Sequence, residues 1–181
     1  SINSVTYHTS IYLHNILNPI MKYLSTTVPS SQEALLRMQN LRLSNGSLLL
    51  CADVTSLYPS IPIEYGLSAV HKMLELVIQR QLMTINIPLT MALLKWVLTN
   101  NYFTFNNTIY KQLTGTAMGT PVAPVYANIV LFWIDVKCCE NKLPMYMRYL
   151  DDIFAIVNDE QHATNTVQTF NNQCPTLKLE A

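Results

Sequence analysis

The chain has 181 residues, of which 50% are hydrophobic and 12% are charged. This length and composition allow a sizeable core and exclude an intrinsically disordered protein. The 11 basic and 11 acidic side chains balance, so no overall positive field points to a nucleic-acid partner. The first residues lack the pattern of a signal peptide, and no apolar run approaches membrane-spanning length, which disfavours secretion and membrane insertion.

The four cysteines form no CxxC pair and share no zinc-type spacing with histidine, which favours a reducing compartment. The sequence opens on Ser1 and stops at KLEA, within a predicted element. We therefore expect it to be part of a longer protein.

The first half of the chain predicts two helices, a buried strand and two further helices. Apolar spacing indicates a helix at 11–23, capped by Ser10, and a second at 31–41 with Ala34, Leu35 and Met38 facing inward. The run SLLLCADV at 47–54 is typical of a buried strand that ends in an acid. A proline-containing turn follows at 56–62, and helices are predicted at 64–81 and 89–98.

The second half of the chain alternates hairpins and helices. Aromatic and polar residues alternate on both sides of Asn106 and Asn107, which predicts a hairpin at 101–112. A loop rich in Gly, Pro and Thr begins at 113, and a long apolar helix is predicted at 122–136. A second hairpin at 145–157, a helix at 160–171 and a short strand at 176–180 complete the pattern.

The hairpin MYMRYLDDIFAIV at 145–157 places Asp151 and Asp152 between two apolar runs. One interpretation is a turn, because Asp is a common turn residue. That explains the turn but not the doubled acid, since two neighbouring carboxylates in apolar surroundings repel each other unless a cation neutralises them. This stretch alone leaves both interpretations open.

Strands and helices interleave without the regular alternation of a doubly wound fold, so we expect an α+β fold with helices on one face of the sheet. The order suits a split βαβ core, as in ferredoxin-like or RRM-like domains, with an antiparallel sheet. Such a core would bring Asp53 beside Asp151 and Asp152. Taken alone, Asp53 is typical of a strand-end acid. Three carboxylates at one sheet edge instead predict magnesium and phosphodiester chemistry.

Three stretches of the chain resemble the palm motifs A, B and C of reverse transcriptases, in that order. They are DVTSLYPSIP at 53–62, GTAMGTPVAPVYAN at 115–128 and RYLDDIF at 148–154. The similarity is closest to Penelope-like retroelements, through NNYFTFNNTIYKQLTGTAMGTPVAPVYANI before the acid pair and FNNQCPTLKLE after it. The resemblance implies a helical fingers-side segment at 1–45 and a palm at 46–181, with the rest of the fingers and the thumb outside this sequence.

The resemblance implies an RNA-directed DNA polymerase with two Mg²⁺ ions, or Mn²⁺ in their place. Asp53, Asp151 and Asp152 would be the catalytic acids and metal ligands, joined by the backbone carbonyl of Val54. The implied partners are an RNA template, a DNA primer and a dNTP, without a membrane. Family members copy at chromosomal DNA ends, so we expect a nuclear protein.

The resemblance also assigns substrate contacts. Tyr58 would be the steric gate against a ribose 2′-hydroxyl, or simply an aromatic packed beside Pro59. Gly115 and Gly119 would let the backbone approach the template base and the incoming nucleotide, and Met118 would contact the substrate beside Gly119. The family uses the positions of Arg148 and Tyr149 to shape the site near the primer end. The alternative is a solvated Arg148 beside a Tyr149 packed in the core.

Two other functions stay open. A degenerate fragment could survive as a nucleic-acid or protein-binding module without catalysis. A metal-dependent nuclease could use the same carboxylates, but it offers no role for Tyr58 or for the glycine loop at 115–120.

Overall fold

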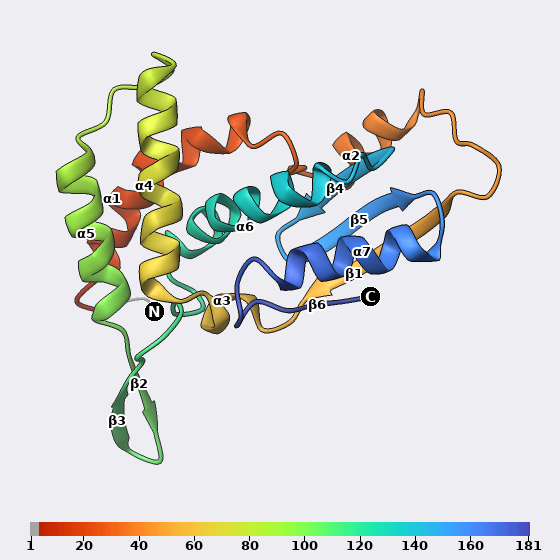
Figure 1. Cartoon of the computed structure of the whole chain (residues 1–181). Coiled ribbons are helices and arrows are strands. Elements are labelled where there is room, and N and C mark those ends of the chain that lie inside the picture. Colours follow the sequence, from red (N-terminus) through yellow and green to blue (C-terminus); the bar gives the residue numbers. More distant parts are fainter. Residues whose placement is uncertain (1–3) are drawn as a thin grey trace. The chain divides into compact units, whose positions relative to one another are not determined.

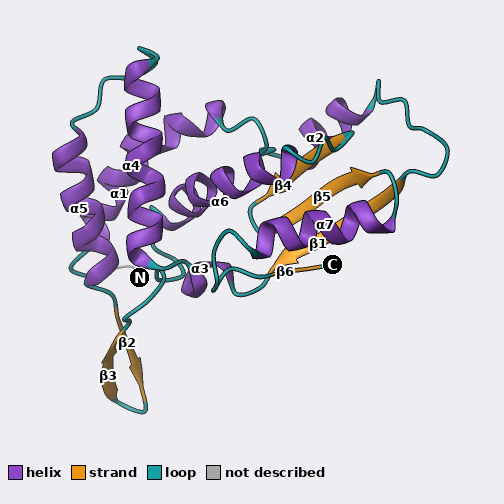
Figure 2. Ribbon diagram, viewed as in Figure 1, coloured by secondary structure: helices purple, strands orange, loops and turns teal. Residues whose placement is uncertain are grey.

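The computed structural model describes residues 4–181 (Figure 1). The helices are α1 (Tyr7–Leu17), α2 (Ser31–Met38), α3 (Leu57–Ser60), α4 (Ile63–Gln79), α5 (Ile87–Thr99), α6 (Ala123–Cys139) and α7 (Glu160–Asn171), with a 3-10 helix, η1, at Asn18–Tyr23. The strands are β1 (Leu48–Val54), β2 (Tyr102–Phe105), β3 (Thr108–Lys111), β4 (Met145–Tyr149), β5 (Asp152–Val157) and β6 (Leu179–Glu180). Figure 2 shows the helices and strands in separate colours.

The chain forms two compact units, each built from two segments. The first contains the chain up to Tyr23 and Tyr58–Val130, and the second contains Leu24–Leu57 and Leu131–Ala181. The predicted division into a fingers-side segment at 1–45 and a palm at 46–181 is a functional assignment, and it stays a prediction. No helix within residues 4–181 has both the length and the hydropathy needed to span a bilayer.

The second unit is built on an antiparallel sheet with the strand order β4-β5-β1-β6. On one face of this sheet, Leu50, Ala155 and Val157 form a buried cluster. Ala163 and Val167 of α7 pack against that cluster. The predicted α+β fold with an antiparallel sheet is confirmed, and α7 covers one face of the sheet (Figure 1).

The alternation along β1 gives the sheet two different faces. Leu50, Ala52 and Val54 are buried, whereas Cys51 and Asp53 are exposed. Successive side chains of a strand point to opposite faces, so the apolar set packs inward. Asp53 is therefore carried on the open face of the sheet.

The first unit consists of helices and one hairpin. Helix α5 packs against α1 and α4. The predicted hairpin at 101–112 is confirmed, with β2 and β3 joined through Asn106 and Asn107 at φ of 47° and 59°. Positive φ at both turn residues is typical of a type I′ turn, which Asn tolerates.

Two details of the predicted helices are wrong. Ser10 does not cap α1, because the helix begins earlier, at Tyr7, and the Ser10 hydroxyl instead accepts a hydrogen bond from the backbone N–H of Val122 (3.0 Å). Helix α2 buries none of its residues, and the Leu35 side chain is 59% exposed. Its apolar residues are not part of a closed core.

Candidate active site

The three acids predicted from the sequence meet at one end of the second unit's sheet. Asp53 on β1 lies directly opposite Asp152 on β5. The backbone N–H of Val54 donates a hydrogen bond to the carbonyl of Asp151 (3.0 Å). Strand pairing thus fixes the end of β1 against the hairpin that carries the acid pair.

A fourth acid joins this cluster, and no sequence motif pointed to it. Glu180 on β6 lies opposite Asp53 on the other side of β1. The short strand at the end of the chain was predicted, but its pairing partner was not. Glu180 adds a further negative charge beside Asp53.

The electrostatics of the cluster are unfavourable for four ionised carboxylates. Desolvation raises the pKa of the Asp53 carboxyl, and the charges of Asp151, Asp152 and Glu180 raise it further. Like charges this close disfavour one another's ionised form unless a cation intervenes. The cluster therefore has the charge that a divalent cation would neutralise.

The donor set of the cluster fits magnesium, which prefers oxygen ligands from a few carboxylates. Within residues 4–181, no three acidic, His or Cys side chains are already arranged as a metal-binding group.

A groove of about 740 Å³ opens beside the acids on the exposed face of the sheet. Its walls come from α2 and from strands β1, β4, β5 and β6. They include Ala34, Leu35, Met38, Cys51, Asp53, Met147, Tyr149, Asp152, Phe154 and Glu180. The groove explains why the apolar residues of α2 are not buried, since they line an open surface with acids at one end.

The burial of Arg148 and Tyr149 is the opposite of what the structural alternative predicted for them. Arg148 is fully buried and Tyr149 is 49% exposed, where the alternative was a solvated arginine and a packed tyrosine. Alternation along β4 explains the reversal, because Arg148 shares the helix-covered face with Ile153, its partner on β5. Burial leaves Arg148 without the exposure that direct contact with a substrate needs, whereas Tyr149 lines the groove.

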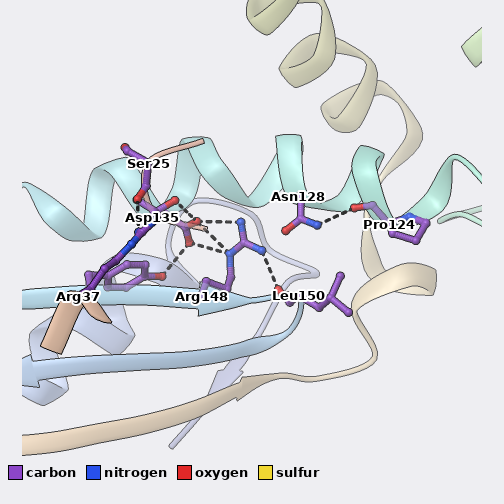
Figure 3. A network of polar contacts seen from close by, with 9 residues as sticks. Ser25, Arg37, Pro124, Asn128, Asp135, Arg148 and Leu150 are labelled. Carbon is purple, nitrogen blue, oxygen red and sulfur yellow. Dashed lines mark hydrogen bonds and ion pairs between the residues drawn. The ribbon is translucent and has the colours of Figure 1, made fainter. Parts of the chain in front are cut away.

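Arg148 is held by Asp135 of α6, a residue that none of the sequence motifs includes. The Arg148 guanidinium bonds to the Asp135 carboxylate at 2.9 Å and donates to the carbonyl of Leu150 at 2.7 Å (Figure 3). A lone acid within the apolar run LFWIDVK could have signalled a buried ion pair.

The remaining predicted residues lie in the first unit. The backbone N–H of Thr116 donates to the carbonyl of Tyr58 (2.9 Å), so the glycine loop is bonded to the segment of the predicted gate. A side chain at Gly115, whose φ is 71°, would overlap the backbone of Tyr58 and Pro59. Glycine is thus required there for close packing within the protein.

The other loop residues are open. Gly119 has a φ of 78° and no atom within 4 Å of a Cβ built on it, and the Met118 side chain is 69% exposed. Tyr58 is half-buried, which suits both a packed aromatic and a ring with one accessible face.

The raised pKa of Asp53 predicts a stability effect in the absence of metal. A carboxyl with a higher pKa in the folded chain binds its proton more tightly there, so the fold gains stability as the pH falls through that raised pKa toward the ordinary value of 3.8. We expect Asp53→Asn to melt about 1 to 3 °C above the wild type at pH 7 in EDTA, with a smaller difference at pH 4, where the raised pKa leaves much of the Asp53 carboxyl protonated. Thermal unfolding at both pH values measures this, and a lower melting temperature for Asp53→Asn would contradict it.

The chain is similar to one protein family in sequence and to several solved proteins in structure. A family model described as reverse transcriptase (RNA-dependent DNA polymerase) matches residues 5–181. No curated protein matches the chain by sequence. Solved telomerases are similar in structure, and this chain spans about a third of their length.

Two of these structures illustrate the similarity. Apo telomerase from Candida tropicalis, truncated from its C-terminal domain, matches with a TM-score of 0.66 and 12% identity over 91% of this chain and 37% of that one. Telomerase from Candida albicans in complex with a fragment of telomeric RNA matches with a TM-score of 0.67 and 11% identity over 97% of this chain and 33% of that one. At such low identity the likeness concerns the fold.

Proposed function

Because the chain belongs to the reverse transcriptase family, we propose that it forms the catalytic core of an RNA-directed DNA polymerase. Its antiparallel sheet with helices on one face is the palm fold of this family. The observation that carries the proposal is the pairing of Asp53 with Asp152, beside Asp151, at the end of an open groove. Carboxylates placed in this way suit the transfer of a nucleotide to a primer 3′-hydroxyl.

The acids would hold the metal ions. Asp53, Asp151 and Asp152, with the carbonyl of Val54, are the residues that would bind two Mg²⁺, or Mn²⁺. The ions would supply charge neutralisation at the reacting phosphate and a more acidic primer hydroxyl. The protein's own contribution is to align the reactants, since positioning and fixed charges account for most of the catalysis in phosphoryl transfer.

The other residues would select and orient substrates. The half-buried ring of Tyr58 would exclude a ribose 2′-hydroxyl, and Met118 and Gly119 would contact the template base and the incoming dNTP. Tyr149 would meet the primer end from the groove wall beside Asp152. The burial of Arg148 favours a role in holding the hairpin over direct contact with the primer.

The biological setting belongs to the same proposal. The motifs favour a Penelope-like retroelement, with an RNA template, a DNA primer and a nuclear site of action. The similar telomerase from C. albicans is in complex with a fragment of telomeric RNA, which is consistent with an RNA partner for a chain of this fold.

A binding module without catalysis is the second candidate. The observation that favours it is the open groove on the sheet, whose apolar residues from α2 suit a bound partner without any chemistry.

Primer extension separates the two functions. The assay uses poly(rA)/oligo(dT), dTTP and Mg²⁺, with this chain and with the full-length natural product of its gene. Extension that disappears in Asp151→Asn supports the polymerase. Duplex binding that is unaffected by metal or by loss of the acids, in a folded protein without extension, would support the binding module instead.

The proposed gate makes a separate prediction about sugar selection. In an active polymerase, Tyr58→Ala should lower the preference for dTTP over UTP by about tenfold or more, because the clash with the 2′-hydroxyl is removed. Tyr58→Phe keeps the ring and serves as the matched control, with selectivity near that of the wild type. The ratio of kcat/KM for the two nucleotides measures the effect. Unchanged selectivity in Tyr58→Ala would exclude the gate.

A further inference from the structure

The carboxylate of Asp135 is the centre of a buried polar network in the second unit. Asp135 is fully buried on α6, and its two oxygens accept hydrogen bonds from the hydroxyls of Thr26 and Tyr146, each at 2.8 Å. The guanidinium of Arg148 adds contacts through Nε and Nη2, both at 2.9 Å from Oδ2. A buried carboxylate with this many donors is fixed in orientation.

Arg148 extends this network to the turn that carries the catalytic acids. While one side of its guanidinium faces Asp135, Nη1 donates to the carbonyl of Leu150 at 2.7 Å (Figure 3). The planar fork of arginine can hold two acceptors at fixed directions, which the single ammonium of lysine cannot do. Asp135 therefore determines the direction in which Arg148 meets the turn.

The turn is a place where such a restraint matters. Leu150 has a φ of 53°, in the left-handed region that a bulky side chain disfavours, and Asp151 follows it directly. On its other side, the carbonyl of Asp151 is held by the N–H of Val54. Two hydrogen bonds thus restrain the turn, one from the N–H of Val54 on β1 and one from the guanidinium of Arg148.

We propose that Asp135 is a positioning residue for catalysis, which acts through Arg148 to hold the Leu150–Asp151 turn and so the placement of Asp151 and Asp152. This inference rests on the proposed polymerase function. An apolar pair of similar volume would fill the same space without the desolvation cost of two buried charges. It would not hold the carbonyl of Leu150, and this difference makes the role testable.

The main test replaces both partners together. Asp135→Leu with Arg148→Met keeps the volume and leaves no unpaired buried charge, so this double variant should fold. Arg148→Lys is the second variant, which keeps the ion pair but lacks the fork. Tyr146→Phe is the control, because it removes one hydrogen bond to Asp135 and leaves the contact between Arg148 and Leu150 intact.

Two measurements are made on each folded variant. Hydrogen exchange at the amide of Val54, which donates to the carbonyl of Asp151, reports the turn without any assay of activity, with the amides of α4 as an internal reference. Steady-state primer extension by the full-length natural protein gives kcat and KM for dTTP. In the double variant and in Arg148→Lys, we expect turn exchange to rise about tenfold and kcat to fall about tenfold, with KM unchanged. Tyr146→Phe should stay within about twofold of the wild type in both.

The outcomes separate this inference from the proposed function. Wild-type exchange at the turn in the folded double variant would overturn the restraint. Faster exchange with an unchanged kcat would overturn the positioning role. A wild type that does not extend primers would remove the proposed function and with it the role in catalysis, while the exchange result would still decide whether Asp135 and Arg148 hold the turn.

Discussion

Asp53→Asn and Asp151→Asn are each expected to reduce primer extension by the full-length protein at least about a thousandfold. Each change keeps the shape of the side chain and removes one negative charge from the cluster in which Asp53 faces Asp152 across β1 and β5. An amide is a poor ligand for magnesium compared with a carboxylate, so the variants lose metal binding as well as alignment. Steady-state extension with dTTP measures the loss.

The control for this loss is a variant of an acidic residue in the first unit. Glu75 on α4 is half-exposed and lies outside the acid cluster, so Glu75→Gln should extend primers at the wild-type rate. Thermal melting in Mg²⁺ gives a readout that does not depend on activity, because Mg²⁺ should raise the melting temperature of the wild type and of Glu75→Gln more than that of the two Asn variants. Extension within tenfold of the wild type by either Asn variant would contradict the assignment of the acids.

The same acids connect function with stability. Repulsion from Asp151, Asp152 and Glu180 contributes to the raised pKa of Asp53, so the metal-free fold carries an unfavourable interaction at neutral pH. Asp53→Asn should therefore stabilise the metal-free fold while it removes extension. Opposite signs for the two effects are expected of a site that is arranged for a cation rather than for the fold.

The position of the acids could be predicted because local strand patterns and the order of the motifs both indicate it. The run at 47–54 predicts a strand that ends at Val54, as β1 does. The hairpin predicted at 145–157 contains β4 and β5, with Asp151 in its turn and Asp152 at the start of β5. The helix predicted at 160–171 is confirmed at both ends. At its N-terminus, Asp159 acts as the N-cap and accepts a hydrogen bond from the N–H of His162. Local signals of this kind need no knowledge of distant segments.

The environment of Arg148 could not be predicted in the same way. Its burial depends on Asp135, which belongs to another element, and on Thr26, which lies more than a hundred residues away in the chain. Periodicity within β4 alone does not reveal which face of a sheet a helix will cover. The exposure of Leu35 has a similar origin, because the surface that α2 faces is an open groove, which helical spacing cannot distinguish from a core.

The buried pair of Asp135 and Arg148 predicts a large, non-additive effect on stability. Asp135→Leu leaves an uncompensated guanidinium in the interior, and Arg148→Met leaves an uncompensated carboxylate. We expect each single variant to lower the free energy of unfolding by about 3 to 5 kcal/mol. The double variant should lose clearly less than the sum of the two single losses, because both charges leave together. The loss that remains, on the order of 1 to 3 kcal/mol for each orphaned group, comes from the hydroxyls of Thr26 and Tyr146, which no longer have the Asp135 carboxylate as an acceptor.

Urea unfolding of the four proteins measures this cycle at pH 7, and the burial of both partners makes the result insensitive to salt. Additive losses would mean that the two side chains act independently, against their 2.9 Å contact. A stable double variant has a further meaning, since it shows that the fold does not need these charges. Extension that the double variant loses and Tyr146→Phe retains is attributable to the turn at Leu150 and Asp151, where Arg148 provides the hydrogen bond that an apolar side chain cannot.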